Sequence, residues 1–254
     1  MKPDEILEIH KHRPFELPEG SWVMRQVWHD LLFAHWPIEK ELITPHIPKD
    51  LQLDLWQGAA WVTISPFYIR PLHIRWLPPP PFVRSFLEFN MRTYVTYKNR
   101  PGIYLLSVDA SSRLAVEAAR FAGLPYLNAD MSMKQRDGMF YYASERKDKR
   151  GESASFKGIY YPTSNEVFHA SHDSQLYWLT ERYRLYTQKR NGVMLAIDIH
   201  HMPWPLQTAE LTIEKNSIGE VLEIKLPNSK KPILTYSGRQ DVLIWPPKKV
   251  ESRG

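Results

Sequence analysis

The sequence predicts a β-rich α+β fold: a single-domain, antiparallel β-barrel with a few short helices. A chain of 254 residues, 43% of them apolar, is long enough for a sizeable core, and barrels of this length occur as one domain. Twenty-one prolines, nine tryptophans and thirteen tyrosines suit many short strands joined by ordered loops. Several segments also alternate apolar and polar residues, which is the pattern of half-buried strands.

The N-terminal part combines a helical arm with a strand. Residues 1–20 have helical spacing of apolar residues followed by a proline-containing connector, so we expect a peripheral arm. Residues 22–36 are dense in aromatic residues and histidine, and both a helix and a strand fit them. The alternation of His29, Leu31, Phe33 and His35 favours a strand, which Pro37 should end. One or two helical turns should follow at 38–43.

Three dipeptides predict hairpin turns: Gln57-Gly58, Asp137-Gly138 and Asn191-Gly192. The strands expected around these turns are residues 51–56 with 59–69, the two halves of 131–144, and 182–188 with 193–199. A proline-rich crossing at 77–81 cannot join a ladder of strands.

The C-terminal part should close the fold with a short helix and two strands. Ser217 and Glu220 have the spacing of a capping box, which predicts a helix through Ile224. Residues 232–236 and 242–245 are the expected closing strands, and residues 247–254 the tail.

The central stretch, residues 85–131, predicts strand, turn, strand, helix and strand. Residues 87–95 alternate strictly, a turn follows at 99–102, and the apolar run 103–108 has the composition of a strand buried on both faces. The first strand should pack one set of side chains and present the other as a polar stripe. The packed set is Leu87, Phe89, Met91, Thr93 and Val95, and the polar set is Glu88, Asn90, Arg92 and Tyr94.

The helix of this stretch should be capped by Ser111 or Ser112 and should end at Gly123. Its predicted apolar face is Leu114, Ala118 and Phe121, with Ala115 and Ala122 beside it. The chain then turns back as a strand in which Tyr126, Asn128 and Asp130 share one face.

These motifs resemble a known superfamily. A glutamate-bearing strand, a hairpin, an apolar strand ending in Asp109, a helix with Ala-Ala-Arg and then Gly-Leu-Pro resemble the acetoacetate decarboxylases. Segments along nearly the whole chain more closely resemble the uncharacterised YqjF-like branch of that superfamily: LLFAHWPI, AWVTISPF, FLEFNMRTYV, GLPYLNADM, LTERYRLY and HMPWPLQ. The resemblance implies an acetoacetate decarboxylase-like barrel.

The resemblance also implies a Schiff-base lysine, which this sequence lacks. Decarboxylases of the superfamily follow the helix with Gly-aromatic-Pro-Lys-Lys, whereas here Gly123-Leu124-Pro125 is followed by Tyr126-Leu127. Lys134 lies eight residues beyond Tyr126, roughly 26 Å along an extended strand, and cannot reach the same point. We therefore expect no Schiff-base chemistry.

Glu88, Asn90 and Arg92 are the main candidates for a site. In a barrel cavity, Arg92 could clamp a substrate carboxylate and Glu88 could move a proton. The resemblance implies that Glu88 matches the glutamate that decarboxylases hold on the strand before the helix. The alternative is a buried Glu-Arg pair that satisfies only itself.

Four other residues are further candidates. Tyr126 could act as an acid or as an oxyanion donor, or could be a core aromatic with a satisfied hydroxyl, and Asn128 continues its face. Residues 92–102 and 182–192 both begin with arginine and end in Arg-x-Gly, which makes Arg182 either a second cavity-lining arginine or a surface one. His35 could also face the cavity.

Composition argues against several classes of function. The formal charge is +5 and the sequence pI about 9.2, but the one dense basic run, residues 145–152, is interleaved with acids, so we expect no nucleic-acid partner. There is no cysteine, the histidine spacings match no metal motif, and no phosphate or dinucleotide loop occurs, so we expect no metal and no cofactor. With no long apolar run, no membrane partner and a cytoplasmic location are expected.

The sequence therefore predicts binding or processing of a small, partly apolar carboxylate or carbonyl compound in a barrel cavity, and leaves open whether the protein is an enzyme. One alternative is a non-catalytic ligand-binding or sensory module. Another is an oligomerisation or interaction protein that uses exposed tryptophans, and a homo-oligomer is compatible with each of these hypotheses.

Overall fold

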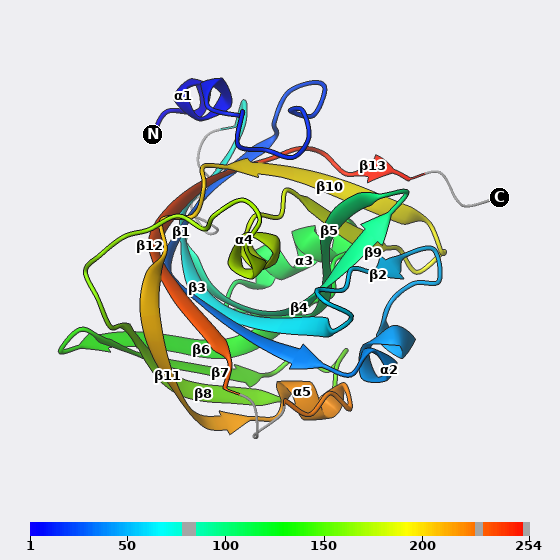
Figure 1. Cartoon of the computed structure of the whole chain (residues 1–254). Helices are drawn as coiled ribbons and strands as arrows, with labels where there is room; N and C mark the ends of the chain where they lie inside the picture. Colours follow the sequence, from blue (N-terminus) through cyan, green and yellow to red (C-terminus); the bar gives the residue numbers. More distant parts are fainter. Residues whose placement is uncertain (78–84, 227–230, 251–254) are drawn as a thin grey trace.

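A single continuous sheet closes on itself twice in the computed structural model, which describes residues 1–77, 85–226 and 231–250 (Figure 1). Its strands are β1 (Met24–Ile38), β2 (Gln52–Leu53), β3 (Ala60–Ile74), β4 (Phe86–Tyr97), β5 (Arg100–Ala110), β6 (Tyr126–Arg136), β7 (Met139–Arg146), β8 (Ser155–Pro162), β9 (Arg184–Gln188), β10 (Met194–His201), β11 (Gln207–Asn216), β12 (Ile233–Ile244) and β13 (Lys248–Lys249). The helices are α1 (Pro3–Glu8), α2 (Lys40–Ile43), the 3₁₀ turn η1 (Thr44–His46), α3 (Arg113–Phe121), α4 (Gln175–Thr180) and α5 (Ile218–Val221). The predicted strand-rich barrel with a few short helices is confirmed.

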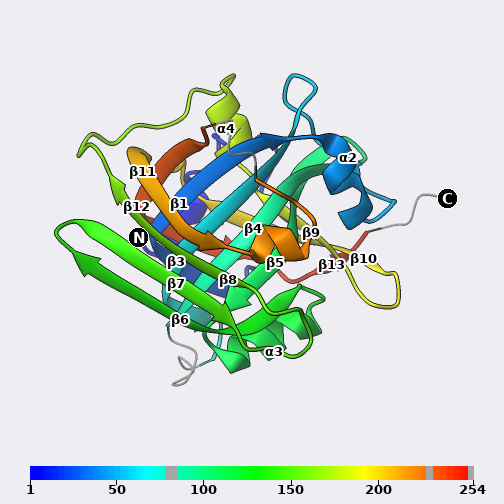
Figure 2. The same ribbon diagram turned by 90° about the horizontal axis from the view of Figure 1, so that it is seen from below.

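The double closure arises because β5 and β12 each divide one edge between two partners. Residues 108–110, at the C-terminal end of β5, pair with β6, and residues 103–104, nearer its N-terminal end, pair with β9. Similarly, β12 pairs with β11 near its N-terminal end and with β10 at its C-terminal end. Five strands, in the order β12-β1-β3-β4-β5, are therefore common to both rings. The larger ring adds β6, β7, β8 and β11, and the smaller ring adds β9 and β10 (Figures 1 and 2).

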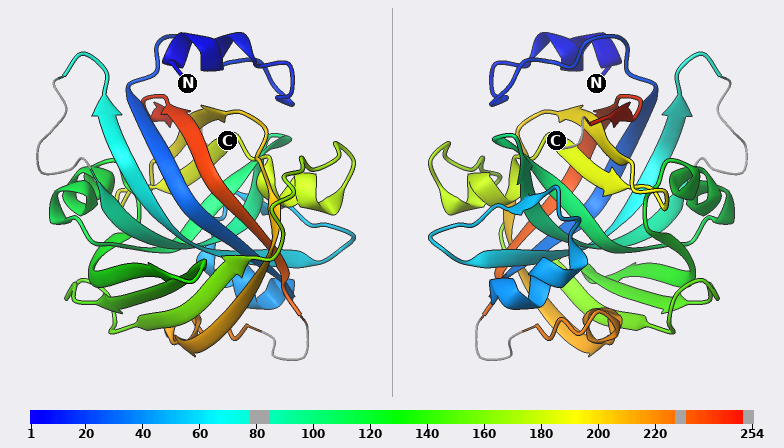
Figure 3. Two further views of the ribbon diagram at one scale, coloured as in Figure 1. Left: turned by 90° about the vertical axis from the view of Figure 1, so that its left-hand side faces the viewer. Right: turned by 90° about the vertical axis from the view of Figure 1, so that its right-hand side faces the viewer.

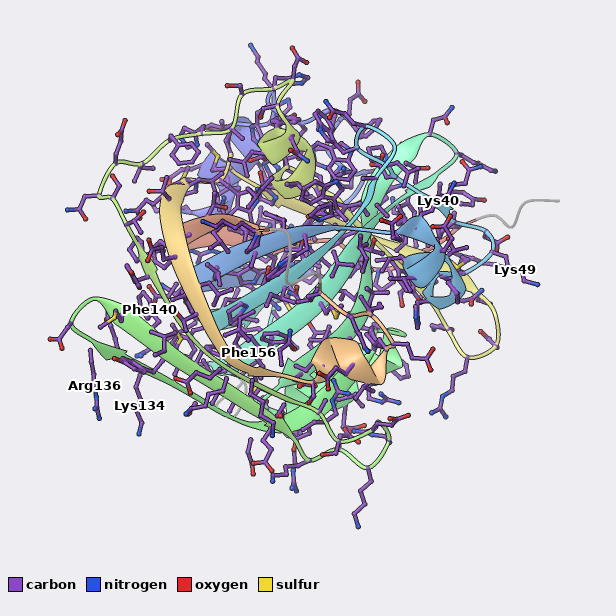
Figure 4. The ribbon with its side chains drawn as sticks, turned by 60° about the horizontal axis from the view of Figure 1, so that its bottom comes forward. Lys40, Lys49, Lys134, Arg136, Phe140 and Phe156 are labelled. Carbon is purple, nitrogen blue, oxygen red and sulfur yellow. The ribbon has the colours of Figure 1, made fainter. Side chains whose placement is uncertain are left out.

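One face of the shared five-stranded sheet forms the main apolar core. Leu87, Phe89 and Met91 of β4 lie on this face, as the alternation of the sequence predicts. They pack against aromatic side chains of β7 and β8 that include Phe140 and Phe156, both labelled in Figure 4. The larger ring is therefore filled by side chains.

The opposite face, which we call the polar face, looks into the smaller ring. It carries Phe33, His35, Trp61, Thr63, Ser65, Glu88, Asn90, Arg92 and Tyr94. Helices α3 and α4 lie over it in the centre of Figure 1, and Trp204 and Leu179 pack against its apolar members. Neither face of the shared sheet is therefore open to solvent.

A β–α–β crossover, β5–α3–β6, joins the shared sheet to the strands that belong only to the larger ring. Ser112 caps α3 by accepting a hydrogen bond from the Ala115 backbone N–H, and Gly123 follows the helix with φ +90°. The helix returns the chain so that β6 runs parallel to β5, whereas the barrel is otherwise antiparallel except for β5 and β9.

The predicted apolar face of α3 is wrong. Leu114 is 56% and Phe121 88% exposed, and the buried residues are instead Ala115 and Val116. Small side chains allow the helix to pack close to β5 and β6. Periodicity alone could not predict the buried face, because tertiary packing decides which face contacts the barrel.

Several boundaries also differ from the prediction. The tight turn after β4 is Lys98-Asn99, both with positive φ, so that β5 already begins at Arg100. Pro37 does not end β1, which continues to Ile38. The two predicted closing strands are one strand, β12. The helix predicted after Ser217 is present as α5 but ends at Val221 rather than Ile224, and the Ser217 hydroxyl makes no capping bond because it accepts from the Ser155 backbone N–H.

Five elements were not predicted: η1, β8, α4, β11 and β13. The alternation of Ala209, Leu211 and Ile213 could have indicated β11, and β13 lies in the segment predicted to be a tail. Most of the proline-rich crossing at 77–81 lies outside the described residues, as do residues 251–254 of the tail. None of the described helices combines the length and apolarity that a membrane crossing requires.

The N-terminal arm is docked at one end of the smaller ring, above β10 in Figure 3. Ile6 is fully buried, and the Ile6 carbonyl accepts a hydrogen bond from His200 at 2.8 Å. The Arg13 guanidinium donates to the Ile199 carbonyl at 2.7 Å. The arm is therefore part of the packed structure rather than a loose extension.

Closure of the smaller ring depends on Gly102, and its replacement tests this. A Cβ at Gly102 would lie 2.7 Å from the Arg184 carbonyl oxygen and 2.7 Å from the Tyr186 ring. We expect Gly102→Ala to lower the free energy of unfolding by about 1–3 kcal/mol, since overpacking forces β5 and β9 apart. Urea denaturation measures this. In the control Gly238→Ala the Cβ meets its nearest atom at 3.6 Å, and stability should stay near wild type. Equal stability of the two variants would contradict the close approach.

Candidate functional site

The candidate side chains lie in adjacent rows across the polar face. On β4, Glu88, Asn90 and Arg92 alternate with core residues and therefore point the same way. Arg92 lies opposite Thr63 of β3, which in turn lies opposite His35 of β1. The register between β4 and β5 shifts just at Arg92, and such bulges commonly re-aim a side chain beside a functional site.

Glu88 is a buried carboxyl group without a cationic partner among the described residues. It is 4% exposed, and it accepts hydrogen bonds from the Tyr126 hydroxyl at 2.9 Å and from the Asn90 side chain. Burial raises the pKa of Glu88 to about 7, although both hydrogen bonds oppose the rise. Glu88 can therefore exist in either protonation state near neutral pH.

Tyr126 holds Glu88 in place. Burial and the neighbouring Glu88 carboxylate raise the pKa of the Tyr126 phenol well above its usual value, so this phenol stays protonated and donates. From the other side of the sheet, the Tyr142 hydroxyl donates to the Glu88 backbone carbonyl at 2.7 Å. The carboxyl group and its strand are thus fixed by two tyrosines.

Arg92 is a buried guanidinium whose charge is not neutralised by a described residue. It is 7% exposed and lies 5.1 Å from the centre of the Phe33 ring. Its Nε and Nη2 atoms are buried and have no hydrogen-bond partner in the described part of the chain. A buried charge in this condition is costly unless an anion neutralises it.

The buried Arg146 offers a direct contrast. Its Nε donates to Asp109 at 2.8 Å and its Nη2 donates to Ser107 at 2.7 Å. That ion pair, between β7 and β5, supplies its own counter-charge. The same chain thus pairs a structural buried arginine and leaves Arg92 unpaired.

His35, the further candidate, lies within this group. One of its ring nitrogens is 2.7 Å from the Thr63 hydroxyl and 3.2 Å from the Tyr94 hydroxyl. Burial, and then the charge of Arg92, hold the pKa of His35 well below its usual value, so the ring is neutral. Its other nitrogen, Nε2, is buried and has no partner among the described residues.

Arg182 is brought to the same region, although it precedes β9 rather than belonging to it. It pairs with Asp54 at 2.6 Å and lies over the rings of Trp178 and Tyr94, at 4.5 and 5.0 Å. Burial lowers its pKa, and the charge of Arg92 contributes. One nitrogen, Nη2, is buried and unpaired in the described chain. Arg182 is therefore buried beside the polar face and is not a surface arginine, which was the other interpretation that the sequence left open.

Unpaired polar atoms concentrate on the polar face and on the residues that cover it. Ten buried side-chain nitrogen and oxygen atoms lack a hydrogen-bond partner within the described residues. They belong to His35, Trp61, Ser65, Asn90, Arg92, Arg182, Trp204, Thr235 and Ser237. Native proteins contain few such atoms, and a cluster of them indicates a place where a ligand or ordered water binds.

One sequence-predicted site residue, Asn128, lies elsewhere, as does Lys134, which the sequence already excluded as a Schiff-base lysine. The Asn128 side chain donates to the Ala110 carbonyl and accepts from Arg113, so it ties β6 to β5 and α3. Lys134 points away from the barrel in Figure 4. All lysines in the described residues are exposed except Lys189, which is partly buried and lies near the Phe121 ring.

Sequence reasoning missed several members of the group. Trp61, Thr63 and Ser65 alternate on β3, and that alternation could have placed them opposite the β4 residues. Thr235 and Ser237 alternate on β12 and lie opposite Phe33 and Leu31 of β1. Trp204 carries no local signal, because only the fold of the chain brings it over the polar face.

The hollows in the described part of the molecule include the following two. The first, of about 10 Å³, lies under the N-terminal arm and is lined by Arg182. The second, of about 380 Å³, is an open groove on β6, β7 and β8. Neither is lined by Glu88 or Arg92. Within the same residues, no three His, Asp or Glu side chains form a group that could hold a metal.

Comparisons with known proteins agree with the resemblance. Residues 25–241 match the model of the DUF2071 family, described as "Uncharacterized conserved protein". "Uncharacterized protein YqjF" of Bacillus subtilis (strain 168) is 46% identical over 245 residues, which cover 96% of this chain and 99% of that protein.

Solved structures share the fold at low identity. Acetoacetate decarboxylase from Legionella pneumophila subsp. pneumophila str. Philadelphia 1 has a TM-score of 0.67 at 10% identity, over 99% of this chain and 97% of that chain. The enduracididine biosynthesis enzyme MppR complexed with pyruvate has a TM-score of 0.64 at 11% identity, over 93% and 94%. The expected acetoacetate decarboxylase-like fold is confirmed.

The raised pKa of Glu88 predicts how stability depends on pH. Its folded-state pKa, about 7, lies above the usual 4.5, so the stabilisation is complete below pH 4.5 and is lost as pH rises toward 7. The loss should be about 3 kcal/mol. In Glu88→Gln this pH-dependent loss of stability should disappear. The free energy of unfolding of the variant, relative to that of wild type, should therefore rise between pH 4 and 8. Urea denaturation across this range measures it.

The control is Glu166→Gln, in the exposed loop between β8 and α4. It should follow the wild-type pH profile. If Glu88→Gln also follows that profile, the carboxyl group is not held in its neutral form.

Proposed function

The chain belongs to the DUF2071 family of uncharacterized conserved proteins and has an acetoacetate decarboxylase-like fold, and from this premise we propose that it binds a small, partly apolar carboxylate or carbonyl compound on its polar face. The observation that carries the proposal is Arg92, a buried guanidinium with two unpaired nitrogens. A ligand carboxylate would neutralise this charge and accept both hydrogen bonds in the bidentate geometry that arginine favours.

The surroundings of Arg92 favour an anion over a cation. Besides Arg92, unpaired nitrogens are contributed by His35, Trp61, Trp204 and Arg182. The nearby Asp54 is engaged by Arg182, and Glu88, with a pKa of about 7, is only partly ionised near neutral pH. The region thus has more donors and positive charge than its own acceptors can use.

Aromatic rings define the rest of the expected ligand. The Phe33 ring contacts both Arg92 and Trp204, and the rings of Tyr94 and Trp178 lie tilted against each other with their centres 4.7 Å apart. Such rings accept an apolar group next to the charged end. These surroundings support a ligand that is anionic at one end and apolar elsewhere.

Glu88 is the group that could give the site a chemical activity. Glu88 and Arg92 are four residues apart on one strand, about 13 Å between Cα atoms, with Asn90 between them. A ligand held at Arg92 would therefore extend along β4 toward Glu88. With a pKa of about 7, Glu88 could accept or donate a proton there, and Tyr126 would position it.

A Schiff-base reaction is not part of the proposal. The lysines of the described residues lie outside the polar face, and Tyr126 and Leu127 follow the Gly-Leu-Pro motif. The protein would thus use the barrel of the decarboxylases without their covalent intermediate.

A ligand-binding or sensory module without catalysis is the second candidate, and the absence of a buried lysine from the described residues favours it. Binding without turnover, unchanged in Glu88→Gln, would identify this case. An interaction protein that uses exposed tryptophans is the third, and Trp76, 73% exposed, is its best support. A cytoplasmic location and assembly into a homo-oligomer stay predictions.

Removing the Arg92 guanidinium tests the proposal. We expect Arg92→Met, which keeps the length of the side chain, to weaken carboxylate binding about 10- to 100-fold, the cost of a lost charge-assisted pair. Suitable probes are pyruvate and acetoacetate, each compared with its methyl ester. Calorimetric titration measures the affinities.

The matched control is Arg136→Met, at the exposed tip of β6 (Figure 4). It should bind as wild type does. Affinity unchanged in Arg92→Met for every carboxylate that binds, or equal affinity for acid and ester, would refute an anion site at Arg92.

A further inference from the structure

Arginines gather at a second place, the hollow under the N-terminal arm. Its walls include Arg13 from the arm, Arg100 at the start of β5, and Arg182 and Arg184 around the start of β9. Its volume of about 10 Å³ is close to what one water molecule needs. The hollow is therefore a small, arginine-lined recess at one end of the smaller ring.

The acids of the recess do not balance these charges. Arg184 uses Asp198, with two hydrogen bonds of 2.6 and 2.8 Å, and Arg182 uses Asp54. The remaining lining acid, Glu181, accepts from the Tyr183 hydroxyl and the Trp204 backbone, and burial raises its pKa.

Two of the four guanidiniums thus have no acidic partner within the described chain. Arg13 is only 8% exposed, yet its hydrogen bonds go to the Phe15 and Ile199 carbonyls and to the His200 ring. Arg100 lies 5.0 Å from the centre of the Phe15 ring and forms no ion pair with a described residue. The recess carries an excess of positive charge.

The pKa directions agree with this excess. Burial lowers the pKa of Arg13 to about 10, with smaller contributions from Arg100 and Arg184. Burial and then the charge of Arg184 also lower the pKa of Arg100. An anion in the recess would relieve both effects.

Arg182 links the recess to the polar face. It lines the recess, its ring contact with Tyr94 lies on the polar face, and its Nη2 is buried without a described partner. A group that binds in the recess is therefore separated from the polar face, which carries Arg92, by the side chain of Arg182.

We propose that the recess is a second, outer anion site, which takes the carboxylate of a small organic acid, with Arg100 and Arg13 as its binding residues. A recess of this size admits one oxygen of a planar carboxylate more readily than a tetrahedral phosphate. A further step, in which the acid passes along Arg182 to Arg92, rests on the function proposed above. The outer site itself does not depend on that function.

The test measures how many ions of formate, the smallest carboxylate, bind to each molecule of the full-length protein. We exchange sodium chloride for sodium formate at constant ionic strength and follow ¹³C-formate binding by NMR. Wild type should bind two formates, whereas Arg100→Gln should bind one, and Arg100→Lys, which keeps the charge, should regain the second. Arg92→Met should keep the outer formate and lose the inner one. Arg136→Gln is the exposed control and should bind as wild type does.

The possible failures are distinguishable. If Arg100→Gln binds as wild type does, the outer site is refuted, and Arg92 is unaffected. If Arg92→Met binds as wild type does while Arg100→Gln loses one formate, the outer site stands and the proposed function fails. Thermal unfolding of each variant in chloride checks that Arg100, which forms no ion pair with a described residue, is not needed for folding.

Discussion

The division of one edge of β5 and one edge of β12 between two partners is the constraint on which the structure depends. It closes two rings around one shared five-stranded sheet, so that both faces of that sheet are covered. A strand in this position would ordinarily be apolar on both sides. Instead, β4 carries Glu88, Asn90 and Arg92 toward the smaller ring, and closure forces these side chains away from water.

Burial without pairing gives these side chains their chemical character. Glu88 gains a pKa near neutrality because it meets hydrogen-bond donors and no cation among the described residues, while Arg92 keeps a charge that no described acid balances. Elsewhere in the same barrel, Arg146 and Asp109 show how a purely structural pair is made. Burial of these unpaired groups on the polar face therefore destabilises the fold, and an anionic ligand would give them the missing partner.

Strand alternation is what the sequence made predictable. It placed Glu88, Asn90 and Arg92 on one face of a strand. Asp137-Gly138 and Asn191-Gly192 located two hairpins, whereas the hairpin predicted at Gln57-Gly58 is wrong, because β2 pairs with β4 instead of β3 and only the bridge between Trp56 and Ala59 forms across that turn. The buried side of α3 was not predictable, because close packing chose Ala115 and Val116 over Leu114 and Phe121. Nor could local pattern bring Arg182 or Trp204 to Arg92, since ring closure joins residues about 90 and 110 positions apart.

The most direct measurement is a high-resolution crystal structure of the protein with saturating pyruvate, read at Arg92. The account predicts a carboxylate whose oxygens lie about 2.7–2.9 Å from Nε and Nη2 of Arg92, with the rest of the molecule directed along β4 toward Glu88. A structure in which only water and protein groups meet the Arg92 guanidinium, under conditions where pyruvate is bound elsewhere, would contradict it.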